Sequence, residues 1–382
     1  MRRLSKMEVI VAETLFVGDG QPPLQNRAVV FDDMKIVDVV PAADAPVSLK
    51  TKNVEVLTPG LIDLQLNGAG GVQFNDEPTA HALNRMATAS RIGGTAWFMP
   101  TFITDMGQKF QEAIKAVEEA ITGETGVVGV HLEGPFLSSL RPGVHMSEAI
   151  RRLEKSDAEA ITGARCPVLL TLTPEEIDLG ILEYLDKAGV RLFAGHSEST
   201  YEDIVVASKY GLKGATHLFN AMSQLSNREP GLVGAAFDLQ HLFAGIIADG
   251  IHVHPANLRT AFKVIGPERL FLVTDAMKPL GTDEPEFELQ GRRILRSKGH
   301  LMTEDGVLSG ADISMIDAVN NFIGLSGCEP TIAVQMATQT PARAMGLDHE
   351  IGTIEVGKRA GFTHLTANLS VVGVTYGASA DG

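Results

Sequence analysis

The segment Val127-Val-Gly-Val-His-Leu-Glu-Gly-Pro135 is a short apolar run that ends in a carboxylate, Glu133, followed by a turn. Similar runs recur along the chain, and amphipathic stretches separate most of them. Short apolar runs that alternate with helical stretches are typical of parallel β/α units. We count eight runs, which predicts an α/β protein with a (β/α)8 TIM-like barrel. They lie at residues 61–66, 95–99, 127–132, 168–172, 191–194, 214–218, 242–247 and 270–274.

Helical periodicity supports this pattern between and after the runs. Ile177, Ile181 and Leu185, for example, recur at the spacing of one helix face. Pro174 lies where a proline suits the first turn of such a helix. The helices expected on this basis lie at residues 174–189, 254–266, 313–325 and 331–345.

Both ends of the chain depart from the alternating pattern. Residues 1–57 contain β-branched runs broken by Gly and Pro turns, which indicate short strands. These strands are too few for an independent sandwich, but apolar runs near the C-terminus can complete it. We therefore predict two domains. A metal-dependent barrel spans residues 58–350, and a small β-sandwich domain is formed from residues 1–57 and 351–382.

Charge and composition exclude several classes of protein. The chain has 382 residues and a net charge of −15, which argues against nonspecific nucleic-acid binding because that requires a basic surface. No apolar run approaches the ~18 residues of a membrane span, and the N-terminus lacks the apolar core of a signal peptide. The two cysteines, Cys166 and Cys328, indicate no disulfide framework. We expect a cytoplasmic protein that binds neither membranes nor nucleic acids.

Polar residues follow several predicted strands, at the end where barrel enzymes place their chemistry. Glu133, His196, His217 and Asp275 belong to the third, fifth, sixth and eighth units. One such histidine alone is more often structural, and one such aspartate is often a helix N-cap. Together, oxygen and imidazole groups at one mouth suit Zn²⁺, Fe²⁺ or Mn²⁺. Three ligands leave a position for an attacking water, and Asp275 then serves as acid and base.

These residues lie within motifs that resemble a known family. The segment Pro59-Gly-Leu-Ile-Asp63 is similar to the strand-one signature of the amidohydrolase superfamily. Within that superfamily the sequence resembles the N-acetylglucosamine-6-phosphate deacetylases, in ordered motifs across the barrel. The motifs are Gln65-Leu-Asn-Gly-Ala-Gly-Gly71, His131-Leu-Glu-Gly-Pro-Phe136, Ala194-Gly-His-Ser197, Ala215-Thr-His-Leu-Phe-Asn-Ala-Met222, Arg228-Glu-Pro-Gly231, Ala248-Asp-Gly-Ile-His252, Val273-Thr-Asp-Ala276 and Leu308-Ser-Gly310.

The resemblance implies a catalytic role for each matching residue. Glu133, His196 and His217 would bind the catalytic metal. Asp275 would take a proton from the metal-bound water and pass it to the leaving amine. His145 would help to polarise the acetamide carbonyl; the alternative for this residue is a solvent-facing position in a loop.

The resemblance also implies a small-molecule substrate, an amino sugar phosphate. Its phosphate would meet Asn220, Ala221, Arg228 and His252, because a dianion requires backbone N–H donors and cations. The alternative for Arg228 is a surface ion pair with Glu229. Some family members place this arginine across a dimer interface, which would make the site composite, and a homodimer is the expectation for the family.

Gln65 and Asn67 stand where many amidohydrolases carry a His-X-His pair that binds a second metal. Amides are poor ligands for a borderline-soft cation, so we predict a single divalent ion. Zn²⁺ is the expected metal, with Fe²⁺ as the alternative because it accepts the same ligands. Gln65 and Asn67 are assigned to substrate binding instead.

The expected reaction is hydrolysis of the acetamide of N-acetylglucosamine 6-phosphate to glucosamine 6-phosphate and acetate. One alternative is a deacetylase of another N-acetyl amino sugar phosphate, such as N-acetylgalactosamine 6-phosphate, since one inverted hydroxyl requires few side-chain changes. Another is a sugar-phosphate binding scaffold without catalysis. That alternative predicts a broken ligand set or a missing acid/base, and both are complete in this sequence.

Overall fold

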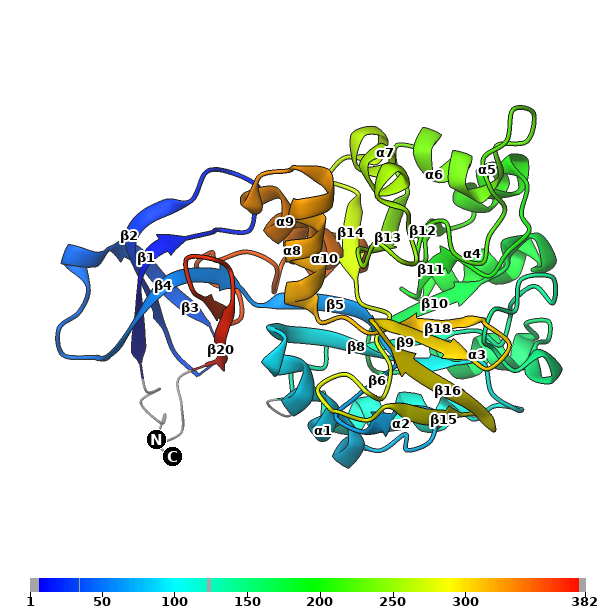
Figure 1. The fold of residues 1–382 in the computed structure, drawn as a ribbon, viewed down its shortest axis with the longest axis horizontal. Helices are drawn as coiled ribbons and strands as arrows, with labels where there is room; N and C mark the ends of the chain where they lie inside the picture. The colour runs from blue at the N-terminus through cyan, green and yellow to red at the C-terminus, as the bar shows by residue number, and fades with distance from the viewer. Residues whose placement is uncertain (1–6, 34, 122–124, 378–382) are drawn as a thin grey trace.

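The computed structural model describes residues 7–33, 35–121 and 125–377. Residues 1–6 and 378–382, which belong to the predicted small domain, lie outside the described ranges. Figure 1 shows a large α/β body with a smaller sheet at one side, built from the blue beginning and the red end of the chain.

Eight parallel strands form the barrel, and each of the eight predicted runs contributes one of them. The strands are neighbours in chain order, and a bridge between Leu66 and Ala276 brings the first strand to the chain that follows the last. A hydrogen bond from the Asp275 N–H to the carbonyl of Gln65, 2.9 Å, reinforces this closure. The strands are β5 (Leu61–Leu66), β8 (Thr95–Ile103), β9 (Val130–Glu133), β10 (Val168–Leu172), β11 (Arg191–Ala194), β12 (Leu212–Ala215), β13 (Phe243–Ile247) and β14 (Leu270–Val273).

Helices surround the barrel strands, and three of them correct the prediction. The helix expected from Pro174 begins only at Leu179, because Pro174–Glu176 forms a separate 3-10 turn and Asp178 caps the helix. A single helix was expected over residues 331–345, but the structure has α9 (Pro330–Met336) and α10 (Gln339–Met345). Pro341 accounts for the break, because its ring would clash with the carbonyl four residues earlier in a continuous helix. The other helices are α1 (Ala80–Ile92), α2 (Phe110–Ala120), α3 (Lys155–Thr162), α4 (Leu179–Lys187), α5 (Tyr201–Lys209), α6 (Gly231–Asp238), α7 (Pro255–Ile265) and α8 (Met315–Ser326).

Both termini build the small β domain, as predicted. Its described strands form one continuous sheet in the order β20-β19-β4-β1-β2-β3, with only β1 and β4 parallel. Successive residues of β2 alternate between two apolar clusters, one on each face of the sheet. The strands are β1 (Glu8–Leu15), β2 (Leu24–Phe31), β3 (Ile36–Pro41), β4 (Lys50–Pro59), β19 (Gly361–Leu365) and β20 (Val371–Tyr376).

A four-stranded antiparallel sheet between β14 and α8 was not predicted. Its residues are short runs of alternating charged and apolar side chains, which give a weak strand signal. The apolar side chains Phe287, Leu289, Ile294 and Leu301 pack with Met277 of the chain after β14. The sheet is therefore an extension of the barrel mouth. Its strands are β15 (Glu286–Leu289), β16 (Arg292–Ser297), β17 (His300–Thr303) and β18 (Leu308–Ala311).

A two-stranded hairpin, β6 (Gly68–Ala69) and β7 (Val72–Gln73), follows the first barrel strand.

Among the helices that the structure describes, none has the length and apolar character that crossing a membrane requires.

Candidate metal centre and active site

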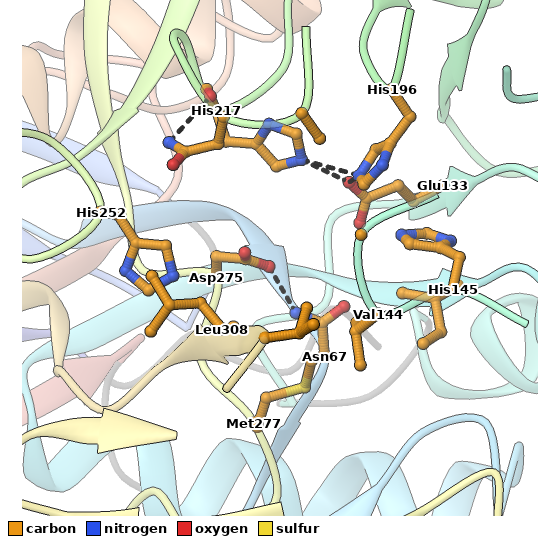
Figure 2. Close-up of a pocket in the computed structure, with 16 residues that line it drawn as sticks. Asn67, Glu133, Val144, His145, His196, His217, His252, Asp275, Met277 and Leu308 are labelled. Carbon is orange, nitrogen blue, oxygen red and sulfur yellow. Dashed lines mark hydrogen bonds and ion pairs between the residues drawn. The ribbon is translucent and has the colours of Figure 1, made fainter. Parts of the chain in front are cut away.

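The three predicted ligands meet at the carboxyl ends of the barrel strands. Glu133 is the last residue of β9, whereas His196 and His217 each lie two residues beyond β11 and β12. Oε1 of Glu133 lies 2.9 Å from Nε2 of His217 and 3.3 Å from Nε2 of His196. The two imidazole nitrogens are 3.1 Å apart. All three side chains are buried, and Figure 2 shows them converging on one point.

The backbone at these positions is strained. His196, His217 and Asp275 have φ values of 49°, 31° and 53°, in the left-handed region that side-chain-bearing residues rarely adopt. Each residue lies just past a strand end, where this conformation turns the chain and directs the side chain into the mouth. Strain of this kind costs about 1–3 kcal/mol per residue and persists only where the surrounding structure imposes it.

The geometry of the cluster fits a divalent metal. Ligands 2.0–2.1 Å from a tetrahedral ion lie about 3.3 Å from one another, close to the separations observed here. Nδ1 of His196 lies 2.8 Å from the carbonyl oxygen of Arg141 and donates to it. This contact leaves the lone pair on Nε2, which faces Glu133, as metal-binding histidines require.

Electrostatics within the cluster also favour a cation. Burial alone raises the pKa of Glu133, but its close contacts with the imidazoles of His196 and His217 outweigh burial and hold this pKa well below its usual range. Burial alone lowers the pKa of His217, yet the carboxylate of Glu133 raises it above its ordinary value. The site thus stabilises positive charge between these groups, which a proton or a metal ion can provide.

Asp275 lies beside the cluster and is held by two amides. The side-chain nitrogen of Asn67 donates to its Oδ1 at 2.7 Å, and that of Gln65 donates to the same oxygen at 3.1 Å. Among the described residues, Oδ2 accepts no hydrogen bond. Burial, and next the negative charge of Glu133, raise the pKa of Asp275 to about 6. A carboxyl group that titrates near neutrality suits a general acid and base.

His145 lines the same pocket. Its side chain is buried, which contradicts the alternative of a solvent-facing loop residue. The backbone N–H of Thr104 lies 3.4 Å from Nδ1 of His145 and can only donate, so Nδ1 accepts and Nε2 carries the proton. Burial, with repulsion from His196, lowers the pKa of His145 well below its usual value and keeps the ring neutral.

The pocket around these groups has a volume of about 190 Å³, much larger than the space of one water molecule. One side is an apolar wall that sequence reasoning missed, because its residues lie outside the polar strand ends. Val307, directly before β18 of the unpredicted sheet, belongs to it with Ile103, Val144 and Met277. The predicted site residues that line the pocket are Asn67, Glu133, His145, His196, His217, Asn220, Ala221, His252 and Asp275.

His252 has a buried partner that was also missed. Its Nδ1 lies 2.5 Å from Oδ2 of Asp249, and Oδ1 of Asp249 accepts the backbone N–H groups of Ile251 and His252 at 2.8 Å. The spacing Asp-Gly-Ile-His is itself a signal, since a carboxylate three residues before a histidine in a turn can reach the ring. Asp249 therefore fixes the orientation of His252 toward the pocket.

Two predicted residues do not line the pocket. Gln65 lies behind Glu133, and its amide nitrogen donates to both carboxylate oxygens at 3.2 Å. Arg228 is exposed on the loop before α6 and has no ion pair or hydrogen bond within the described part of the chain. The expected alternative, a pair with Glu229, is also not observed, because Glu229 accepts the N–H groups of Tyr201 and Gly231.

Most of the chain matches a known protein family. The model of the amidohydrolase family matches residues 56–377. Among curated proteins, the N-acetylgalactosamine-6-phosphate deacetylase of Shewanella sp. strain ANA-3 is 39% identical over 83% of this chain and 81% of its own length. The N-acetylglucosamine-6-phosphate deacetylase of Haemophilus influenzae is 35% identical over 92% of this chain and 93% of its own.

A solved structure of such a deacetylase has the same fold as this chain. The crystal structure of N-acetylglucosamine-6-phosphate deacetylase from Pasteurella multocida superposes with a TM-score of 0.92 at 34% identity. The match covers 97% of this chain and 98% of that one. The similarity therefore includes the small β domain as well as the barrel.

Proposed function

We propose that this chain, which belongs to the amidohydrolase family, hydrolyses the acetamide of N-acetylglucosamine 6-phosphate to glucosamine 6-phosphate and acetate. One observation carries the proposal: Glu133, His196 and His217 converge within about 3 Å of one another in a pocket that also holds Asp275. A non-catalytic scaffold would have no need of this arrangement, which is costly to bury and strained in its backbone.

Glu133, His196 and His217 would hold one divalent ion, Zn²⁺ or Fe²⁺. Bound there, the ion supplies a Lewis acid and lowers the pKa of a water molecule. The amide nitrogens of Gln65 and Asn67 face the carboxylates of Glu133 and Asp275. These N–H donors stand beside the two carboxylates where a second cation would require oxygen or imidazole ligands, which supports a single ion.

Asp275 is the proposed proton carrier. Its Oδ2 takes a proton from the attacking water, and the protonated carboxyl donates it to the leaving amine as the C–N bond breaks. Asn67 and Gln65 hold Oδ1 and so fix the plane of the carboxylate. The Nε2–H of His145 donates a hydrogen bond to the acetyl carbonyl oxygen as negative charge develops there.

The sugar phosphate is assigned to the side of the pocket that contains Asn220, Ala221 and His252. None of the described residues that line the pocket is a lysine or arginine. A phosphate dianion would therefore benefit from a cation supplied from elsewhere. Arg228 is exposed and without a partner within the described residues, so we propose that it reaches the pocket of a second copy in a homodimer.

N-acetylgalactosamine 6-phosphate is the second candidate substrate. The relative from Shewanella and a relative from Escherichia coli O157:H7, 33% identical, both carry the name N-acetylgalactosamine-6-phosphate deacetylase. The two sugars differ in the configuration of one hydroxyl, whereas the ligand cluster and Asp275 act on the acetamide that both contain. The chemistry is thus common to both candidates.

The activity is assigned to the cytoplasm. Cys166 and Cys328 are both free, and Cys166 is buried. Free thiols are the usual state of cysteine in reducing compartments.

Acetate release is the direct test. The enzyme, loaded with one equivalent of Zn²⁺, is assayed on N-acetylglucosamine 6-phosphate, N-acetylgalactosamine 6-phosphate and unphosphorylated N-acetylglucosamine. We expect the highest kcat/KM on the first substrate and loss of activity after chelation, restored by added Zn²⁺. Preference for the galactosamine epimer would select the second candidate, and no release of acetate from either phosphate would contradict both.

A further inference from the structure

A layer of polar side chains crosses the barrel interior directly beneath the ligand cluster. Thr101, His131, Thr171 and Thr216 form it, and all four are buried. Nδ1 of His131 lies 3.2 Å from Oγ1 of Thr101, and its Nε2 lies 2.7 Å from Oγ1 of Thr171. Oγ1 of Thr171 lies 2.6 Å from Oγ1 of Thr216. We call these four residues the polar layer.

The polar layer links strands that are distant in the sequence. Thr101 belongs to β8, His131 to β9 and Thr171 to β10, and Thr216 directly follows β12. The backbone N–H of Leu66, in β5, donates to Oγ1 of Thr101 at 3.0 Å and extends the chain of hydrogen bonds to the first barrel strand. The linked hydrogen bonds therefore reach from β5 to the end of β12, with β11 crossed on the way.

Polar groups in this position require an explanation. Layers inside such barrels are usually filled by bulky branched apolar residues. A buried hydroxyl or imidazole is tolerated only when its hydrogen bonds are made, and an apolar layer would avoid that requirement. No side-chain nitrogen or oxygen of the polar layer is among the unpartnered buried atoms of the described residues. The layer is complete, and general packing does not account for its polarity.

Three members of the polar layer, His131, Thr171 and Thr216, lie next to the ligand cluster. His131 precedes Glu133 by two residues, so both point to the same face of β9. Thr216 directly precedes His217. Gly195, which precedes His196, provides the space in which two layer members meet. A Cβ at this glycine would lie 2.8 Å from Thr171 Cγ2 and 3.0 Å from Thr216 Cβ.

We propose that the polar layer positions the metal ligands, with His131 as its central positioning residue. Hydrogen bonds of 2.6–3.2 Å are directional, whereas apolar contacts restrain the sliding of strands less specifically. The layer therefore fixes β9, β10 and the end of β12 relative to one another. That restraint holds Glu133 and His217 at their close separation before an ion binds, so less ordering is required on binding. The inference rests on the proposed function only in assigning a metal to this cluster.

Zinc affinity of isosteric variants tests the proposal. Thr171→Val and Thr216→Val remove one hydroxyl each while keeping nearly the same shape. The metal-depleted protein is titrated with Zn²⁺ against a competing chelator. We expect each variant to bind Zn²⁺ about tenfold more weakly than the wild type, the lower end of the effect of outer-shell changes. Thr171→Ser, which keeps the hydroxyl, should restore most of the affinity.

Thr340→Val is the matched control. Thr340 is buried on α10, outside the barrel, and its hydroxyl donates to the carbonyl of Pro267 at 2.6 Å. This variant should lower the free energy of unfolding by an amount comparable to Thr171→Val, with unchanged Zn²⁺ affinity. Urea unfolding of metal-free and Zn²⁺-loaded protein distinguishes the two effects, because a merely structural loss is equal in both states.

The outcomes separate this inference from the proposed function. Wild-type affinity for Zn²⁺ in Thr171→Val and Thr216→Val would overturn the positioning role. His131→Leu provides a further arm: if it folds, it should lose affinity to at least the same degree, and wild-type affinity would count against His131 in particular. Failure of the wild-type protein itself to bind Zn²⁺ would instead contradict the metal centre.

Discussion

The side-chain nitrogen of Asn67 lies 2.7 Å from Oδ1 of Asp275, and the two residues follow the first and last barrel strands, where the barrel closes. This contact orients the carboxylate without neutralising it, because an amide carries no charge. Asp275→Asn would place an amide against an amide and remove the proton carrier. We expect kcat to fall by about 10²- to 10⁴-fold.

Metal content provides the control for Asp275→Asn. The variant leaves Glu133, His196 and His217 unchanged, so it should retain Zn²⁺ at the wild-type stoichiometry. The comparison is made by steady-state kinetics and by elemental analysis of the same sample. Near-normal kcat would contradict the role of Asp275, and loss of metal would show that this residue belongs to the ligand set.

A second prediction concerns the number of ions. Gln65 presents N–H donors to Glu133 and Asp275 in place of a ligating group. We expect about one tightly bound divalent ion per chain after dialysis against buffer that contains trace chelator. Elemental analysis of protein loaded with excess Zn²⁺ measures this ratio. Two ions that both survive dialysis would show that these amides do not prevent a second site.

Arg228 provides a third prediction, which tests the homodimer. If Arg228 serves the pocket of the other copy, Arg228→Ala and Asp275→Asn are each defective but complement one another when mixed. Half of the dimers in an equal mixture contain both chains, and each mixed dimer has one complete site. We expect about a quarter of wild-type activity on the phosphorylated substrate after the subunits exchange.

A second exposed arginine and an unphosphorylated substrate provide the controls for this experiment. Arg259→Ala, which removes a different exposed arginine on α7, should leave activity unchanged. Unphosphorylated N-acetylglucosamine should be affected much less than the phosphate by Arg228→Ala. No recovery of activity in the mixture would show that Arg228 does not act between subunits, and equal losses on both substrates would separate it from the phosphate.

The barrel was readable from sequence because each strand coincides with a short, largely apolar run and several of these runs are followed by polar residues. Glu133, His196 and His217 could be grouped since parallel strands bring their ends to one mouth. Other features depend on tertiary packing that leaves no local pattern. The sheet that contains Phe287 and Ile294 has weak, alternating signals, and the break between α9 and α10 required weighing Pro341 against a helical periodicity.

Hydrogen bonds between side chains of the site that are distant in sequence were even harder to predict. Thr171 and Thr216 are 45 residues apart, and only the barrel brings their hydroxyls together. The same holds for Nδ1 of His196 and the carbonyl of Arg141. Sequence patterns indicate which face a side chain occupies, but not which partner it meets across the barrel. The second copy that we propose for Arg228 would be a partner of this kind.

The last prediction concerns the pH dependence of stability and uses His364 on β19. This histidine is fully buried, and neither ring nitrogen has a hydrogen-bond partner within the described residues. Burial, with the nearby charge of Lys52, lowers its pKa to about 4, against about 6.5 in an unfolded chain. Protons therefore bind the unfolded chain more readily. The contribution of neutral His364 to the free energy of unfolding is therefore fully present above pH 6.5, and it is lost as the pH falls toward 4.

Between pH 7 and pH 5 this difference amounts to about 2 kcal/mol in the free energy of unfolding. His364→Leu removes the titrating group and should flatten the pH dependence by that amount, as measured by urea unfolding of both proteins at each pH. His349→Leu is the control, because His349 is an exposed histidine whose loss should leave the pH dependence unchanged. Parallel curves for wild type and His364→Leu would show that His364 does not contribute to acid unfolding.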